Sequence, residues 1–448
     1  MPPQRGSLQA GRTPQADPAD SPRHLAVQYT AKEASVAHSR RGQAGFASAN
    51  PSVNMEKTLD RKLARIRGDT SSKDFILADA KDADMAFGLA APGRSPEYHG
   101  HEARFRSLAE YRQLMREIVL AGDVDIMLMS ASSNEILTIQ ERLFDHSPVT
   151  PAVRANDTTD IWLAAGSGRY PAQPSRPFRT ATIDHIMCGK LECEPQERRL
   201  GADLGLYSVT FNNDVELDRA TLEAYKAFRL EAEAKGFRHF LEVFDPNAPG
   251  EHPPADVARF INDHIARSLA GVTSRGRPLF LKIPYHGPAA IEALVHYDPT
   301  LVVGILGGSA GTTFDAFHML WEAKKAGARV ALYGRKINNA EHQLTFVRYL
   351  RLVADDQIGP AEAVRAYHAD LARLRIAPHR SLDEDLQRTA TATAYGGAPR
   401  PAPRTGVLPR PAVLPGTPPP GADPDFERMT PAEKARWNLE RWKRVLGW

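Results

Sequence analysis

Two successive apolar segments each place one charged residue at the same position. In HFLEVFDP (239–246) and LFLKIPYH (279–286), Glu242 and Lys282 each follow an aromatic residue and a leucine. The surrounding residues are typical of buried β-strands, where an unpaired charge costs several kcal/mol. If the two strands are neighbours in matching register, about 4.8 Å apart, the carboxylate and the amine point into one cavity.

A lysine and a carboxylate placed together in this way can carry out Schiff-base chemistry. An amine among apolar side chains loses its proton more readily, and the free amine attacks a carbonyl carbon. The carboxylate can then move protons during carbinolamine dehydration and carbon–carbon cleavage. The structural alternative is a buried ion pair, or a lysine that extends towards solvent from the end of its strand.

Two glycine-bearing segments further along the chain are typical of a phosphate site. They are VGILGGSAGTT (303–313) and YGRKI (333–337), and each follows an apolar run. The candidate phosphate-binding residues are Gly307, Gly308, Ser309, Gly334 and Arg335. In (β/α)₈ barrels the loops after strands seven and eight bind phosphate, through backbone amides that approach the anion closely where glycine is present. Each segment taken alone also fits a tight glycine turn.

Eight apolar segments alternate with helical patterns in the part of the chain that holds these residues. The predicted strands are 75–80, 124–130, 150–155, 204–211, 238–244, 278–285, 301–306 and 328–334. Strands that alternate with amphipathic helices pair in parallel and are covered by those helices. Eight such units predict an α/β fold of the (β/α)₈ class, a TIM barrel, with an irregular insertion at 156–200 over one end. An open doubly wound sheet is the alternative, but no glycine-rich dinucleotide fingerprint follows the first strand.

The barrel is predicted to lie between two extensions. Residues 1–56 are poor in aromatic residues and are predicted to be disordered, and the barrel occupies 57–388. Residues 389–425 form a proline-rich linker, and 426–448 contain an amphipathic helix with a capping-box signature at its start.

Composition excludes several classes of protein. The chain has 448 residues and a net charge of only +3, so no nucleic-acid partner is expected. No apolar run reaches membrane-spanning length and the first residues lack a signal peptide's apolar segment, which predicts a cytoplasmic protein without a membrane partner. Cys188 and Cys193 are interpreted as reduced thiols. His99 and His101 fit a solvated loop better than a metal site, so no metal and no cofactor are expected.

Residues from roughly 73 to 376 resemble the class I, Schiff-base-forming aldolases of the deoxyribose-phosphate and fructose-bisphosphate aldolase-like barrel superfamily. Within it, the resemblance is to the tagatose-bisphosphate and sulfofructose-phosphate aldolase branch. The motifs that carry it are FLKIPYHG, FLEVF, LGGSAGTTFDAF with GARVALYGRKI, and FILADAKDADMAFG. The resemblance implies Lys282 as the Schiff-base nucleophile, Glu242 as the acid/base, and Asp79 as a helper on the first strand, with Asp82 and Asp84 close by.

The activity implied is reversible aldol cleavage of a phosphorylated sugar or keto compound, without metal or cofactor, by a monomer or a homo-oligomer. Two departures bear on the substrate. The branch has a lysine on strand four where this chain offers Tyr207 and Asn212, and archaeal-type aldolases use a tyrosine where it has Phe244. One alternative is a phosphosugar-binding isomerase or lyase in which Lys282 only pairs charge. The other is an inactive barrel that acts as a scaffold and recruits partners through its C-terminal helix.

Overall fold

The computed structural model describes residues 55–69, 71–95, 105–161, 169–308, 311–393 and 430, all within the unit Val53–Trp448. Several predictions therefore lie outside the described residues. These are the N-terminal extension up to residue 54, the linker from 394, the C-terminal helix apart from Thr430, and the residues Ser309, His99 and His101.

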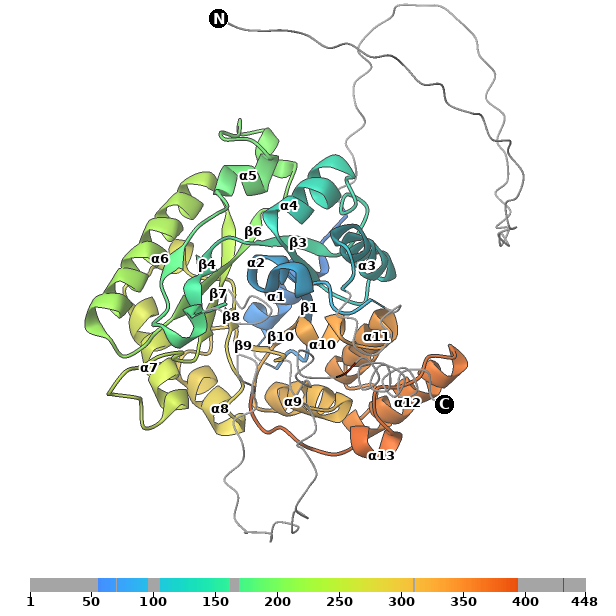
Figure 1. The fold of residues 1–448 in the computed structure, drawn as a ribbon. Coiled ribbons are helices and arrows are strands. Elements are labelled where there is room, and N and C mark those ends of the chain that lie inside the picture. Colours follow the sequence, from blue (N-terminus) through green and yellow to red (C-terminus); the bar gives the residue numbers. More distant parts are fainter. Residues whose placement is uncertain are drawn as a thin grey trace, which may run out of the picture. The chain divides into compact units, whose positions relative to one another are not determined.

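Eight parallel strands form one sheet, and helices surround it (Figure 1). In chain order the strands are β1 (Ile76–Lys81), β2 (Ile126–Met129), β3 (Thr150–Arg154), β6 (Leu204–Thr210), β7 (Arg238–Phe244), β8 (Leu281–Lys282), β9 (Gly304–Leu306) and β10 (Val330–Tyr333). Seven of them fall within segments that the sequence predicts to be strands, and β1 extends one residue, Lys81, beyond the predicted 75–80. The chain is a (β/α)₈ barrel, as predicted.

The sheet closes into a barrel at the seam between β8 and β9. The strands follow the order β8-β7-β6-β3-β2-β1-β10-β9, so these two lie at opposite ends of the hydrogen-bonded series. Ile283, one residue past β8, pairs in parallel with Ile305. Its N–H donates to the carbonyl of Gly304 at 3.0 Å, and its carbonyl accepts from the N–H of Leu306 at 2.9 Å. Backbone hydrogen bonds between β9 and the residue that follows β8 thus close the ring.

Helices follow the strands and cover the outside of the barrel (Figure 1). They are α1 (Thr58–Gly68), α2 (Asp84–Phe87), α3 (Leu108–Ala121), α4 (Ala131–Asn134), α5 (Ile183–Cys188), α6 (Val215–Lys235), α7 (Val257–Ala270), α8 (Pro288–Tyr297), α9 (Thr313–Lys325), α10 (Arg335–Asn338), α11 (Gln343–Ala354), α12 (Pro360–Arg373) and α13 (Leu382–Asp385). None of the helices in the described ranges has the length and apolar character that crossing a membrane demands.

Alternate residues of each strand point into the barrel and fill its lower part. Apolar inward positions such as Ala78, Leu206 and Phe240 belong to one buried cluster. Leu59 and Leu63 of α1 belong to the same cluster, so this helix closes the end of the barrel where the strands begin. The inward positions nearer the carboxyl ends of the strands are therefore left to carry the site, as is usual in this fold.

The insertion after β3 contains a disulfide, which corrects the expectation of two free thiols. Cys188 ends α5, and Gly189 follows it with a positive φ of 74°, a conformation that favours glycine and turns the chain back. This brings Cys193 to a Cα separation of 6.0 Å from Cys188, and the two sulfurs are bonded. The prediction of a cytoplasmic protein loses the support that reduced thiols would have given. Elsewhere the insertion is irregular, as expected, with a two-stranded pairing of β4 (Asp157–Thr158) and β5 (Pro177–Phe178).

Candidate active site

Three inward side chains lie side by side on the adjacent strands β6, β7 and β8. The register pairs Ser208 with Glu242, and Glu242 with Lys282. The two strands that carry the predicted pair are thus neighbours in matching register. The Lys282 Nζ lies 2.6 Å from Glu242 Oε1. The carboxylate is fully buried, and the lysine is 5% exposed.

The two carboxylate oxygens of Glu242 have different surroundings. Oε2 accepts a hydrogen bond of 2.6 Å from the hydroxyl of Ser208 and one of 3.2 Å from the guanidinium of Arg154. Oε1 faces the amine of Lys282. One oxygen therefore fixes the orientation of the carboxylate, and the other is presented to the lysine.

Arg154 joins this group from β3 and was not singled out from the sequence. Its Nη1 donates to Ser208 Oγ at 2.8 Å, and its Nε donates to Asp82 Oδ2 at 2.6 Å. Asp82 follows β1 directly and is 6% exposed. A signal for Arg154 was present, because it is the only charged residue of its strand segment TPAVRA, as Lys282 is of LFLKIPY.

The four charged groups balance one another. Lys282 and Arg154 supply two positive charges, and Glu242 and Asp82 supply two negative ones. Buried charges are stable when they are paired and further hydrogen-bonded, and each of these four lies within 3.2 Å of an opposite charge. The barrel can hold a charged lysine in its interior for this reason.

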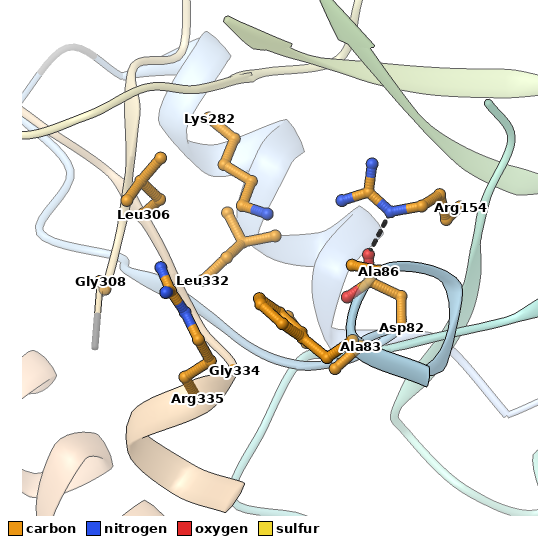
Figure 2. A pocket seen from close by; sticks show the side chains of 13 residues that line it. Asp82, Ala83, Ala86, Arg154, Lys282, Leu306, Gly308, Leu332, Gly334 and Arg335 are labelled. Atoms are coloured by element: carbon orange, nitrogen blue, oxygen red, sulfur yellow. Dashed lines mark hydrogen bonds and ion pairs between the residues drawn. The ribbon is translucent and has the colours of Figure 1, made fainter. Parts of the chain in front are cut away.

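A cavity opens beside this group at the carboxyl ends of the strands (Figure 2). Its lining residues are Ala80, Asp82, Ala83, Ala86, Phe87, Arg154, Lys282, Leu306, Gly307, Gly308, Leu332, Gly334 and Arg335. Figure 2 shows the side chains of Lys282, Arg154 and Arg335 pointing into it from three different elements. The structure thus brings the predicted lysine together with four of the five predicted phosphate-site residues, and the fifth lies outside the described residues.

Close packing requires glycine at these positions of the two loops, in addition to any role in binding an anion. A Cβ on Gly307 would fall 2.1 Å from the ring of Tyr333, and one on Gly334 would fall 2.7 Å from a backbone oxygen of β1. Gly308 has a φ of +61°, which side chains rarely adopt. All three glycines line the cavity. Arg335 lies over the ring of Phe87, 5.6 Å from its centroid, at the cavity wall.

The structure places Asp79 away from the cavity, which corrects its expected position. Its side chain points outwards from β1, where it forms an ion pair of 2.9 Å with the buried Lys81. Lys81 also donates to Asn338 Oδ1 at 2.8 Å and Gln343 Oε1 at 2.9 Å. Burial raises the pKa of Asp79 and lowers the pKa of Lys81. Asp82 is the first-strand carboxylate that lines the cavity.

The two first-strand carboxylates should therefore respond differently to loss of charge. Asp79→Asn should lower the free energy of unfolding by up to about 3–5 kcal/mol, because it leaves the buried ammonium of Lys81 without its counter-charge. Asp82→Asn should leave the fold intact and change the reactivity of the lysine in the cavity. Denaturant unfolding and covalent trapping with a ketone, run on both variants, check this. If Asp79→Asn kept the stability of the wild type but lost trapping, Asp79 would have to be assigned a role in the active site.

The residues noted as departures lie on both sides of the β6 and β7 strands. Tyr207 points outwards and stacks on Phe228 with 4.5 Å between ring centroids. Phe244 points inwards and packs in a small cluster with the cavity residues Ala86 and Leu306. Asn212 is buried beyond the end of β6, where its amide bonds to Asn247 at 3.0 Å. Among the described residues, no group of three or more His, Cys, Asp or Glu side chains is arranged to hold a metal ion.

Comparison with known proteins gives structural likenesses at low sequence identity. No family model matches the chain, and no curated protein matches it significantly. An archaeal fructose 1,6-bisphosphate aldolase is similar with 14% identity and a TM-score of 0.47, over 67% of this chain and 100% of that one. A Schiff-base-forming fructose-1,6-bisphosphate aldolase gives 15% and 0.46, over 66% and 100%. Orotidine 5'-phosphate decarboxylase from Pyrococcus horikoshii OT3 gives 13% and 0.33, over 62% and 98%.

Proposed function

We propose that this chain is a class I aldolase-type lyase that cleaves a phosphorylated sugar or keto compound through a Schiff base on Lys282. The observation that carries the proposal is the position of its Nζ, 2.6 Å from Glu242 Oε1 at the wall of a cavity that also holds two arginines. A carboxylate at this distance can take the proton that the amine must lose before it attacks a carbonyl.

The carboxylate of Glu242 can serve each proton transfer of the reaction in turn. It accepts a proton from Lys282, whose amine adds to the ketone carbon and forms a carbinolamine. It returns the proton to the carbinolamine hydroxyl, which leaves as water and gives an iminium ion. A base then removes the proton of the substrate hydroxyl two carbons away, the carbon–carbon bond breaks, and the electrons pass to the iminium nitrogen as an enamine. An aldehyde leaves, and protonation and hydrolysis release the second product.

Arg154, Ser208 and Asp82 are assigned supporting roles. Arg154 and Ser208 hold the second oxygen of Glu242, which keeps the first oxygen facing the amine. The guanidinium also stabilises the negative charge of the carboxylate when the lysine is neutral. Asp82 holds the other side of Arg154 and reaches the cavity, where it can bind a substrate hydroxyl.

A phosphate group is proposed to bind at the loops after β9 and β10, through backbone amides and Arg335. Gly307, Gly308 and Gly334 bring the backbone close to the cavity, and Arg335 supplies the charge. Tagatose-type bisphosphates and sulfofructose phosphate are the substrates that the sequence resemblance puts forward first. The absence of a strand-four lysine makes the wider class of phosphorylated ketoses the better starting panel.

Arg335→Ala should raise the Michaelis constant for phosphorylated substrates roughly 10- to 150-fold, because a charge-assisted hydrogen bond contributes about 1.5–3 kcal/mol. The constant for an unphosphorylated analogue should change much less. Steady-state kinetics with a matched substrate pair measures both. Arg329→Ala is the control, since Arg329 lies before the amino end of β10 and bonds to the carbonyl of Ala328. Equal effects on both substrates would remove phosphate from the proposal.

Borohydride reduction in the presence of phosphorylated ketones tests the covalent step directly. A Schiff base is reduced to a stable secondary amine, and mass mapping identifies the lysine that carries it. Modification at Lys282 is the expected result. A second candidate function is a non-covalent isomerase or lyase, which is favoured by the ion pair that Lys282 makes with Glu242. Substrate turnover without any trapped adduct would select that candidate.

A further inference from the structure

Residues 385–393, here called the C-terminal strap, begin at the last residue of α13 and run beside the segments that follow β9 and β8. The sequence predicts that the barrel ends at residue 388, but the structure attaches residues on both sides of that point to the loops of the site. The strap makes hydrogen bonds to the segment that follows β9 and to the segment that follows β8. These segments carry the proposed phosphate cradle and the lysine strand.

The first attachment is to Asp315 at the start of α9. This carboxylate accepts hydrogen bonds from the N–H of Thr389 at 2.9 Å, from its hydroxyl at 2.6 Å, and from the N–H of Ala390 at 3.1 Å. It also accepts from the N–H of Thr312, and it is 2% exposed. Asp315 therefore ties the strap to the far side of the loop that begins with Gly307.

The second attachment joins Thr393 to Tyr285, three residues beyond the lysine. The N–H of Tyr285 donates to Thr393 Oγ1 at 2.6 Å, and the N–H of Thr393 donates to the carbonyl of Tyr285 at 3.0 Å. The methyl group of Thr393 also packs against Gly308, where an added Cβ would lie 3.1 Å from it. Gly308 lines the cavity, so Thr393 supports the cavity wall from behind.

We propose that the C-terminal strap positions the phosphate cradle, with Thr389 and Thr393 as positioning residues that never touch the substrate. The inference rests on the proposed function. The strap contacts Gly308 just after β9 and Asp315 at the start of the following helix α9. Its Thr393 is also bonded to Tyr285, in the backbone that follows Lys282. By holding these segments, the strap sets the distance between the bound phosphate and the reacting carbonyl. A displaced cradle binds phosphate less well and holds the carbonyl away from the amine.

Removing the hydroxyl of Thr393 is the most direct test of this inference. Thr393→Val keeps the shape and the contact with Gly308, and it leaves the buried N–H of Tyr285 without its acceptor. Thr389→Val removes the hydroxyl contact with Asp315 at the other attachment. Thr391→Val is the matched control, because Thr391 lies between them and is exposed.

All three variants are made in the full chain and compared with the wild type by equilibrium dialysis against labelled inorganic phosphate. Thr393→Val and Thr389→Val should each weaken phosphate binding about tenfold, equivalent to about 1.4 kcal/mol. Thr391→Val should stay within about twofold of the wild type, since its side chain faces solvent. Borohydride trapping with unphosphorylated dihydroxyacetone should fall by a smaller factor than phosphate affinity does, because that ketone does not use the cradle.

Equal phosphate affinity in the wild type and both attachment variants would overturn the inference and leave the proposed function standing. A wild type that binds no phosphate would overturn the inference together with the cradle, and adduct formation at Lys282 would report separately on the Schiff base. Equal losses of phosphate binding and of dihydroxyacetone trapping would also overturn it, because they indicate general damage. If neither attachment variant folds, the strap is a requirement of the fold and not a positioning element.

Discussion

Lys282→Met will leave a folded barrel that forms no borohydride-trapped adduct and has no lyase activity. Methionine keeps the length and the apolar stem of the side chain but has no amine to attack a carbonyl. The fold should survive because Arg154 and Ser208 still hold the carboxylate of Glu242, so the loss of one buried partner should cost less than the usual 3–5 kcal/mol, about 1–3 kcal/mol. Mass mapping after reduction and thermal unfolding measure the two effects.

The control for this variant is a second buried lysine outside the cavity. Lys324 of α9 is 8% exposed and donates to the carbonyl of Ala354 and to Asp356, both at 2.6 Å. Lys324→Met removes a comparable buried amine and should keep both the adduct and the activity. Wild-type turnover by Lys282→Met would exclude covalent catalysis by this residue, and the ion pair with Glu242 would then have a structural role only.

The relation between lysine and glutamate could be predicted because the two strands repeat one local pattern. Each has a buried aromatic residue two positions before its charge, and Phe240 and Phe280 stack in the barrel with ring centroids 4.5 Å apart. Side chains alternate between the two faces of a strand, so equal spacing from matching aromatic residues places both charges on the inner face. The prediction needed only the sheet order, which the eight-fold alternation of strands and helices supplied.

The helper on the first strand could not be predicted in the same way. FILADAKDAD is buried on both faces of the barrel wall, so the alternation of alanine with Asp79 and Lys81 does not tell the inner side from the outer side. Asp79 is held on the outer side by its ion pair with Lys81. Lys81 donates in turn to Asn338 and Gln343, more than 250 residues further along the chain. The position of Asp82 follows from this outer-face network, which only the folded chain assembles.

Arg154 and the C-terminal strap show two other limits of the sequence. A single arginine in an apolar strand predicts a buried partner, but the choice among Asp82, Ser208 and Glu242 depends on distances across the barrel. The strap has one large apolar residue, Leu386, which packs against the core, and hydrogen bonds hold the rest, so its sequence shows no apolar periodicity. Residues 389–393 read TATAT and carry no apolar pattern, so a boundary drawn from the sequence falls before Thr389.

Glu242→Gln should lower turnover by a factor of about 10²–10⁴, the usual contribution of a positioned acid/base group. The amide has the same shape, so Ser208 and Arg154 lose part of their bonding while the barrel keeps its packing. The amide cannot take the proton of Lys282 or return it to the carbinolamine. Trapping at Lys282 should therefore still occur, but with a much slower rate than in the wild type. Rapid-quench borohydride reduction measures that rate beside steady-state turnover.

The matched control is Glu231→Gln on α6. Glu231 is a partly buried glutamate that is ion-paired with Arg179 and Lys235 on the outside of the barrel, away from the cavity. It should retain wild-type trapping and turnover, because no step of the reaction uses it. A Glu242→Gln enzyme that forms the adduct as fast as the wild type, but still turns over slowly, would move the role of Glu242 from Schiff-base formation to carbon–carbon cleavage. Unchanged turnover would contradict its assignment as the acid/base and leave Asp82 as the carboxylate that serves the lysine.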